Sequence, residues 1–271
     1  MKTTQHKTWV LAAGFALSTV ATHAFTYNPG DLMLNFHQTG SRDLEVNIGS
    51  VVTYRNLGPG QQIVVTQYTG EQLTAAFSSL DGLSFGVMSA VPVGQTVDGQ
   101  VGKTLWVTNP RIDVNVQSTP FLRKTGSSQA NTASIILGVA GLGSASGAVP
   151  WSAGTSFDSV TNSSTAIIIS ATDSSAYSVI AGTSGDLGLS YGNIENITPS
   201  GFTSGQYLRS DLYEAAPRTA LNQDATYLGY FEFGADGVTT FNSVPEPGTF
   251  AILALGGLSL LCIQRLRRNN Q

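Results

Sequence analysis

Two pairs of acidic residues have a spacing that would allow glycoside hydrolysis. Asp43 and Glu45 alternate onto one face of an expected strand, and Asp211 and Glu214 lie close together in the sequence. Glycosidases place two carboxyl groups about 5–9 Å apart, one of them acting as the acid. Residues 25–244 contain sixteen acidic residues, however, so pairs at this spacing are expected by chance. We therefore predict a non-catalytic chain in which neither pair is favoured.

Only one imidazole is available for nucleophilic or metal chemistry in the body of the chain. His6 and His23 fall within an expected leader, so the body retains His37 alone. The single cysteine, Cys262, lies in an apolar tail, which excludes a disulfide or a thiolate zinc site from the body. A Ser-His-Asp mechanism would have to use His37, which we expect at a strand end as a hydrogen-bonded surface residue. We predict no catalytic residue, no metal and no cofactor.

Calcium binding and sugar binding remain open as weaker alternatives. Calcium takes about six to eight oxygen ligands, but the sequence has no D-x-D-x-D-G loop, and Asp98-Gly99 and Asp236-Gly237 are typical of turns. A sugar site would use exposed aromatic side chains. Trp106 alternates with apolar neighbours and is expected in the core, whereas Trp151 is expected to be exposed in a polar stretch.

The distribution of charge argues against nucleic acid as a partner. Only 11% of the residues are charged, against roughly 25% in a typical soluble domain. Residues 25–244 carry eight Lys or Arg against sixteen Asp or Glu, a formal net charge of −8. Binding to a phosphate backbone requires clustered basic residues, so we predict no nucleic-acid partner. A polar surface with few charges suits an exported, strand-rich protein.

Alternation of apolar and polar residues predicts the elements that position these side chains. Short strands separated by turn residues indicate an antiparallel all-β ectodomain, either a sandwich or a barrel-like sheet. The expected strands are 31–37, 44–48, 51–54, 62–67, 84–91, 104–108, 112–117, 167–169, 206–215, 225–233 and 238–242.

Two stretches depart from the strand pattern. Residues 71–80 place Leu73, Ala76, Phe77 and Leu80 on one face, which predicts a short amphipathic helix. Residues 125–165 are rich in Ser, Gly, Ala, Thr and Asn. Within them, residues 128–139 are compatible with a second helix, and the alternative is an exposed insertion or loop.

The first residues of the chain have the layout of a secretory signal peptide. Lys2 and Lys7 precede an apolar run from Trp9 to Ala21, which is too short to cross a bilayer of roughly 30 Å as a helix. The run is followed by the small-x-small sequence Thr22-His23-Ala24, which predicts cleavage after Ala24. The chain is therefore expected to leave the cytoplasm through the Sec translocon.

The last residues combine a stiff extended motif, an apolar span and a basic end. Val244-Pro245-Glu246-Pro247 contains two prolines, which prevent helix and favour an extended backbone. Residues 248–263 carry no charge, and a transmembrane helix of that length would span about 24 Å. Arg265, Arg267 and Arg268 follow, and the positive-inside rule places these arginines in the cytoplasm.

This order of parts resembles the PEP-CTERM sorting signal of Gram-negative bacteria, and the resemblance covers residues 244–271. It implies that an exosortase, a membrane processing enzyme resembling cysteine proteases, recognises Pro245-Glu246-Pro247 while the apolar helix anchors the chain transiently in the inner membrane. Release or transfer to the cell surface would follow. Proteins with this signal occur in bacteria that make exopolysaccharide and biofilm matrix. The alternatives are a permanent single-span anchor and a GPI signal, which also uses a hydrophobic tail but fits the prolines and arginines poorly.

We therefore expect a signal peptide over 1–24, an ectodomain over 25–243 and a sorting signal over 244–271. The predicted function is that of an exported surface or extracellular-matrix protein without catalytic activity, associated with exopolysaccharide. The alternative is a carbohydrate-active module, either lectin-like or weakly hydrolytic, and a structural polymer built through exposed strand edges is a third option. The expected partners are an exosortase, the Sec translocon, the inner membrane and exopolysaccharide.

Overall fold

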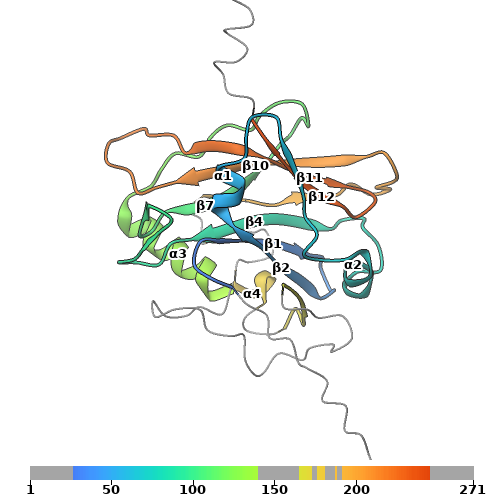
Figure 1. The fold of residues 1–271 in the computed structure, drawn as a ribbon. Helices are drawn as coiled ribbons and strands as arrows, with labels where there is room; N and C mark the ends of the chain where they lie inside the picture. Colours follow the sequence, from blue (N-terminus) through green and yellow to red (C-terminus); the bar gives the residue numbers. More distant parts are fainter. Residues whose placement is uncertain (1–26, 140–164, 173–175, 181–186, 188–190, 245–271) are drawn as a thin grey trace, which may run out of the picture.

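The ectodomain is built on one curled, antiparallel β-sheet (Figure 1). The computed structural model describes residues 27–139, 165–172, 176–180, 187 and 191–244. Among these residues, no helix has both the length and the apolar character needed to span a membrane. The expected signal peptide and the expected transmembrane helix over 248–263 lie outside the described residues.

The described residues form twelve strands and four helices. Their bounds are β1 Asp31–His37, β2 Asp43–Ser50, α1 Val51–Arg55, β3 Gln62–Val64, α2 Gly70–Ala76, β4 Ser84–Ala90, β5 Thr96–Val97, β6 Gln100–Val101, β7 Leu105–Pro110, α3 Gly126–Val139, β8 Ala166–Ile169, α4 Tyr177–Ile180, β9 Asn196–Ile197, β10 Tyr207–Ala215, β11 Thr226–Gly234 and β12 Thr239–Ser243. The main sheet has the order β3-β12-β11-β10-β7-β4-β1-β2-β8, with β9 paired to β4, while β5 and β6 form a separate hairpin.

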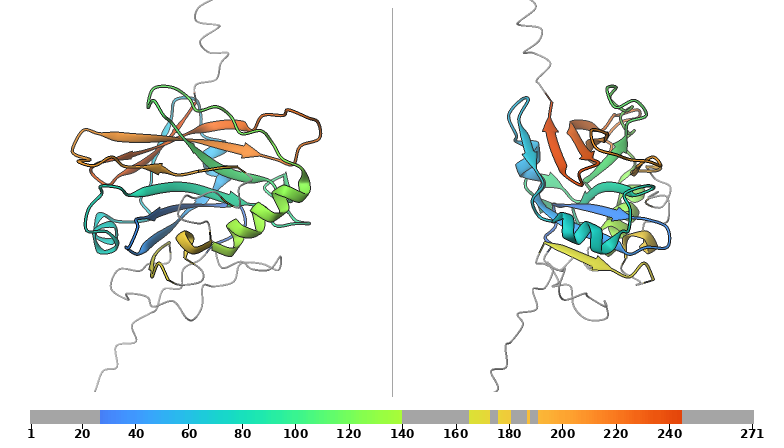
Figure 2. Two further views of the ribbon diagram at one scale, coloured as in Figure 1. Left: turned by 180° about the vertical axis from the view of Figure 1, so that it is seen from behind. Right: turned by 90° about the vertical axis from the view of Figure 1, so that its right-hand side faces the viewer.

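Aromatic packing inside the curl shows how strongly the sheet bends. Strands β1 and β11 are four positions apart in the sheet, which would separate them by about 19 Å if the sheet were flat. The ring centroids of Phe36 on β1 and Phe233 on β11 nevertheless lie 5.3 Å apart, and Phe85 on β4 contacts Phe233 at the same distance. The sheet therefore wraps around these rings. The right-hand view of Figure 2 shows the curl of its strands.

Alternation along the strands gives the sheet two apolar faces. We call the face inside the curl the inner face. Its core includes Phe36, Phe231 and Phe241 and is capped by Tyr54 of α1 and Leu73 of α2. The other side, which we call the outer face, is covered in part by α3 and α4, and its core gathers apolar side chains from β4, β7, β8 and β10.

The expected antiparallel all-β architecture is confirmed, and the sheet takes the barrel-like arrangement rather than that of a sandwich. The expected helix over 71–80 is α2, which begins at a capping box of Thr69 and Gln72 and buries Leu73 and Ala76 as predicted. It ends at Ala76 rather than at residue 80, because Phe77 takes an extended conformation. The helix expected within 125–165 is α3, whose buried residues include Ile136 and Val139. The rest of that expected insertion, over 140–164, lies outside the described residues.

The expected strand over 51–54 is wrong, because these residues form α1. Gly49 has a φ of +93° at an irregularity near the end of β2. The side chain of Ser50, the last residue of that strand, then accepts a hydrogen bond from the N–H of Val52 as the helix cap. The helical turn places Val51 and Tyr54 on one side, and both side chains are buried. Burial of this pair thus overrides the strand preference of β-branched residues.

The expected strand over 112–117 is also wrong. The backbone turns there, with the N–H of Val116 donating to the carbonyl of Asp113 at 2.9 Å and the Asp113 side chain accepting from the N–H of Asn115. Ile112 and Val116 are both exposed. Asp113 and Asn115 supply the local hydrogen bonds that favour a turn, and no neighbouring strand among the described residues pairs with this segment.

Replacing Gly229 with alanine should destabilise the domain severely. Gly229 on β11 has a φ of +145°, and a Cβ there would press on the carbonyl oxygen of Asn242 and lie 2.6 Å from the ring of Phe241. We expect a loss of at least about 2 kcal/mol in the free energy of unfolding, because both backbone strain and overpacking oppose the change.

Gly70→Ala is the matched control, because Gly70 opens α2 and a Cβ there would meet no atom within 4 Å. It should leave the stability unchanged or raise it by up to about 1 kcal/mol. Urea unfolding of the purified full chain measures both values. Equal stability of the two variants would contradict the packing described for β11 and β12.

Candidate functional site

The folded domain continues to the first residue of the expected sorting segment. Ser243 ends β12 and is buried, and its N–H donates to the carbonyl of Gln61 at 3.0 Å. The hydroxyl of Ser243 accepts from the N–H of Gln61 and donates to the carbonyl of Gly58. Val244 is the last described residue. The expected motif therefore begins directly after β12, whose last residue is hydrogen-bonded to the neighbouring loop.

The other predicted sorting residues lie outside the described residues. They are Ala24 at the signal cleavage position, Pro245, Glu246 and Pro247 of the motif, and Arg265, Arg267 and Arg268 of the basic end. Trp151 also falls outside.

Asp43 and Glu45 share one face of β2, as alternation predicts, but both carboxylates are fully buried. Asp43 Oδ2 accepts from the N–H of Ser178 at 2.7 Å, and Glu45 Oε1 accepts from the N–H of Tyr177 at 2.9 Å. These N–H groups belong to the first turn of α4, where the helix itself supplies no acceptors. The pair therefore attaches α4 to the sheet rather than facing a substrate.

The surface position expected for His37 is wrong, because its side chain is only 5% exposed. Its Nε2 lies 2.7 Å from Oε1 of Glu195, which is itself buried, and its ring lies tilted against that of Tyr177, with the centroids 5.6 Å apart. Strand β9 pairs with β4, next to β1, and so brings Glu195 alongside His37. A charge buried this deeply is tolerable because its partner neutralises it.

The pKa values of this buried group follow from burial and from the neighbouring charges. Burial alone would lower the pKa of His37, but the hydrogen bond and negative charge of Glu195, with a smaller contribution from Asp43, raise it above its ordinary value. Burial raises the pKa of Asp43, and the N–H of Ser178 partly offsets that effect. Both residues therefore hold a proton more tightly in the folded chain than in the unfolded chain.

The second acid pair is not brought together. Asp211 is fully buried, and its Oδ1 accepts from Nε of Arg111 at 2.7 Å while its Oδ2 accepts from the N–H of Ser118 at 2.6 Å. Glu214 faces the inner core and accepts from Nε1 of Trp106 at 2.9 Å. A spacing of three along a strand points two side chains to opposite faces. Trp106 is fully buried, as predicted.

Arginine and tyrosine side chains form a stacked row on the outer face of β10 and β11. The guanidinium carbon of Arg111 lies 4.4 Å from the ring centroid of Tyr230, and that of Arg209 lies 4.8 Å from the same ring. Arg209 also lies 4.7 Å from the ring of Tyr207 and pairs with Glu232 at 2.8 Å. Cation–π contacts favour such fixed stacking, so Tyr207 ends the row with a well-defined position.

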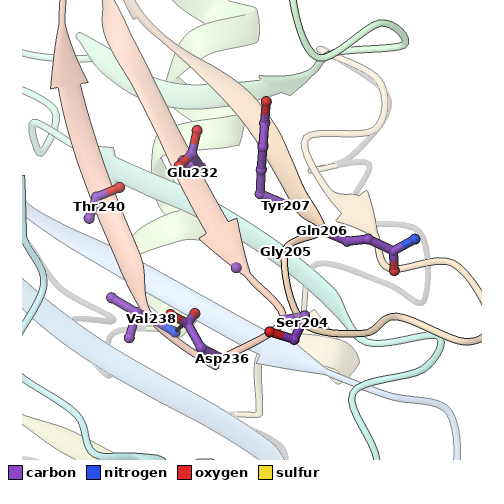
Figure 3. A pocket seen from close by; sticks show the side chains of 10 residues that line it. Ser204, Gly205, Gln206, Tyr207, Glu232, Asp236, Val238 and Thr240 are labelled. Atoms are coloured by element: carbon purple, nitrogen blue, oxygen red, sulfur yellow. Dashed lines mark hydrogen bonds between the residues drawn. The ribbon is translucent and has the colours of Figure 1, made fainter.

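A pocket of about 250 Å³ opens beside Tyr207 (Figure 3). The start of β10 and the β11–β12 hairpin form it, so it draws on two segments that the sheet places side by side. Figure 3 shows Tyr207 and Glu232 projecting to the same side from neighbouring strands, with Thr240 across from Glu232 and with Ser204 and Asp236 near the turn. We call this the β10–β12 pocket.

The Asp-Gly sequences considered for calcium form turns. Asp98-Gly99 joins β5 to β6, and Asp236-Gly237 joins β11 to β12, with positive φ at Asp98, Gly99 and Gly237. Among the described residues, no group of three or more His, Cys, Asp or Glu side chains is arranged to hold a metal ion.

Three residues of these side-chain groups are not predicted from the sequence: Glu195, Tyr207 and Glu232. Glu195 carried no signal, because its partner His37 lies 158 residues away. The strands expected over 206–215 and 225–233 contain Tyr207 and Glu232, but neither residue is predicted to form a site. Alternation does place Tyr207 and Arg209 on one face of β10, but only the sheet order shows that this face stands beside Glu232.

The buried His37 and Asp43 groups should make the domain more stable as the pH falls. Because both pKa values are raised on folding, their stabilising contribution is complete below the unfolded values and is lost as the pH rises through the folded ones. The unfolded values are about 6.5 for His and 3.9 for Asp.

Urea unfolding of the full chain between pH 4 and 8 measures this dependence. His37→Gln should remove the dependence of stability on pH near and above pH 6.5. Asp43→Asn should remove the dependence that begins near pH 4. A parent chain whose stability does not change across this range would contradict the buried arrangement.

Residues 243–268 match the family model of the PEP-CTERM protein-sorting motif. No curated protein and no solved structure matches the chain. The matched range begins at the last residue of β12 and includes Pro245-Glu246-Pro247, the apolar stretch and the three arginines. The expected resemblance is thereby confirmed. The chain carries a PEP-CTERM sorting motif and is accordingly an exported exosortase substrate, sorted to the cell surface.

Proposed function

We propose that this chain is a non-catalytic component of the extracellular polysaccharide matrix of a Gram-negative bacterium. The sorting motif over 243–268 carries the proposal, because it directs the domain to the surface on which such a matrix is assembled. The leader engages the Sec translocon, and cleavage after Ala24 frees the start of the ectodomain. The apolar tail then holds the chain in the inner membrane with Arg265, Arg267 and Arg268 on the cytoplasmic side.

The absence of a spacer determines where processing is feasible. Ser243 is part of β12, and its backbone is hydrogen-bonded to Gln61. A protease that needs an extended backbone free of such pairing must therefore act beyond it. An extended segment from Val244 to Pro247 spans about 13 Å. Because proline disfavours a helix, we expect the backbone of the motif to be accessible to the exosortase. Processing within or after the motif would therefore release the whole folded domain.

The positions of the acidic residues support a role without catalysis. Asp43 and Glu45 attach α4 to β2 by accepting from its first N–H groups. Asp211 and Glu214 point to opposite faces of β10, where each has a basic or indole partner. General acid–base catalysis needs a carboxyl group within reach of substrate, and these four groups are engaged inside the fold.

A carbohydrate-binding role is the second candidate function. The β10–β12 pocket favours it, because an exposed tyrosine ring stands there beside carboxylate and hydroxyl groups. Binding without hydrolysis would allow the sorted domain to attach to the matrix polysaccharide.

Replacing both motif prolines, Pro245→Ala with Pro247→Ala, should block sorting. The segment could then continue the apolar helix, so the exosortase would no longer find an extended backbone. We expect at least about a tenfold fall in the surface fraction and accumulation of full-length chain in the inner membrane. The control replaces two exposed loop prolines, Pro59→Ala with Pro199→Ala, which lie outside the motif.

Cell fractionation and mass spectrometry of the surface product measure the outcome. The surface form of the parent chain should begin after Ala24 and lack the apolar tail. Surface material that still ends at Gln271 would overturn the processing proposal.

A further inference from the structure

The β10–β12 pocket has the combination of groups that suits a sugar ring. We propose that it binds a single ring of a neutral polysaccharide; this inference rests on the proposed matrix role and names the class of ligand. Small-molecule sites are concave and combine apolar walls with a few converging polar groups. The pocket supplies the wall from Tyr207 and Val238 and the polar groups from both strands of the hairpin.

Tyr207 provides a fixed aromatic platform. The residue as a whole is 37% exposed, and it lines the pocket. Arg209 stacks on this ring at 4.7 Å and is itself held by Tyr230 and by Glu232. A side chain held in place loses little conformational freedom on binding. The apolar C–H face of a sugar ring can therefore pack on Tyr207 without prior ordering of the pocket.

Hydroxyl and carboxylate groups complement the hydroxyls of a sugar. Glu232 and Asp236 accept hydrogen bonds, whereas the hydroxyls of Ser204 and Thr240 both donate and accept. Figure 3 shows these groups around the opening, with the side chain of Gln206 pointing away from it. Asp236 is already oriented, because its Oδ1 accepts from the N–H of Val238 at 3.1 Å. The pocket thus offers both hydrogen-bond donors and hydrogen-bond acceptors to the hydroxyls of a sugar.

The charge of the pocket selects a neutral ligand. Arg209 pairs with Glu232 and offsets its charge, while Asp236 contributes a second carboxylate at the opening. The local charge is therefore negative, so a uronic acid polymer would be repelled. A divalent cation is disfavoured because the described residues contain no cluster of three or more metal-binding side chains.

The size of the pocket limits how much of a polymer it can hold. Its volume of about 250 Å³ lies below the range of roughly 300–1,000 Å³ usual for drug-sized ligands. One ring fits such a space, and a ligand of so few atoms binds weakly, with a Kd on the order of millimolar. Many surface copies binding one polymer would raise the overall affinity through multivalency.

Binding of oligosaccharides to the purified full chain in detergent tests the proposal. The probes are neutral gluco-, galacto- and manno-oligosaccharides, with an oligouronate as the charged comparison, each measured by NMR with calcium and with EDTA. We expect at least one neutral probe to bind, the oligouronate to fail, and EDTA to have no effect. Tyr207→Ala should weaken binding at least about tenfold, whereas Tyr207→Phe, which keeps the ring, should change it less than about threefold.

The variant Asp236→Asn tests the effect of the pocket's negative charge, because it removes a charge and leaves the shape of the side chain almost unchanged. An asparagine oxygen can still accept from the N–H of Val238, so the turn is preserved. The variant should bind the oligouronate detectably under conditions in which the parent does not. Unfolding temperatures within about 2 °C of the parent would show that Tyr207→Ala and Asp236→Asn fold normally. Binding that needs calcium, or neutral binding unaffected by Tyr207→Ala, would overturn the proposal.

The experiments distinguish a pocket that does not bind sugar from a chain that is not sorted to the surface. A chain that reaches the cell surface and is processed, yet binds none of the neutral probes, refutes the sugar site and leaves the matrix role standing. A chain that binds neutral sugars through Tyr207 but stays in the inner membrane supports the site and refutes the sorting route.

Discussion

The curl of the sheet around its aromatic core is the constraint on which the rest of the structure depends. Rings from the neighbouring strands β1 and β4 meet a ring from β11 inside it, although β11 is three or four positions away from them in the sheet order. Burial of several phenylalanine side chains is worth about 1.5–3 kcal/mol each, and the described body achieves it with no cysteine. Helices α1 and α2 complete this core by adding Tyr54 and Leu73.

The same curl separates the outer face into two regions with different roles. Over β1, β2 and β4 the outer face is buried, and acidic groups there hold α4 or pair with His37. Over β10, β11 and β12 it presents arginine, tyrosine and carboxylate groups beside the pocket. The acidic residues over β1 and β2 therefore serve structure, whereas Glu232 and Asp236 line the pocket at the other end of the sheet.

Regular elements were predictable where one periodicity governed the local sequence. Strands β1, β4 and β12 follow the expected ranges closely, and helix α2 begins where expected although it ends earlier, because each buries alternate or helically spaced side chains. The prediction failed at 51–54, where a positive φ at Gly49 and a serine cap redirect the chain. It also failed at 112–117, where Asp113 and Asn115 favour a turn and no strand in the described part of the chain pairs with the segment.

The sequence by itself determined the sorting motif, because stiff prolines, an uncharged span and terminal arginines act in linear order and need no fold to be recognised. It also determined the all-β class, since alternation is a local property. Only the tertiary structure decided which acidic residues share a surface. The partners His37 and Glu195, and the neighbours Arg209 and Glu232, are joined by strand pairing. Such pairing depends on burial summed over the whole sheet, which no short stretch of sequence contains.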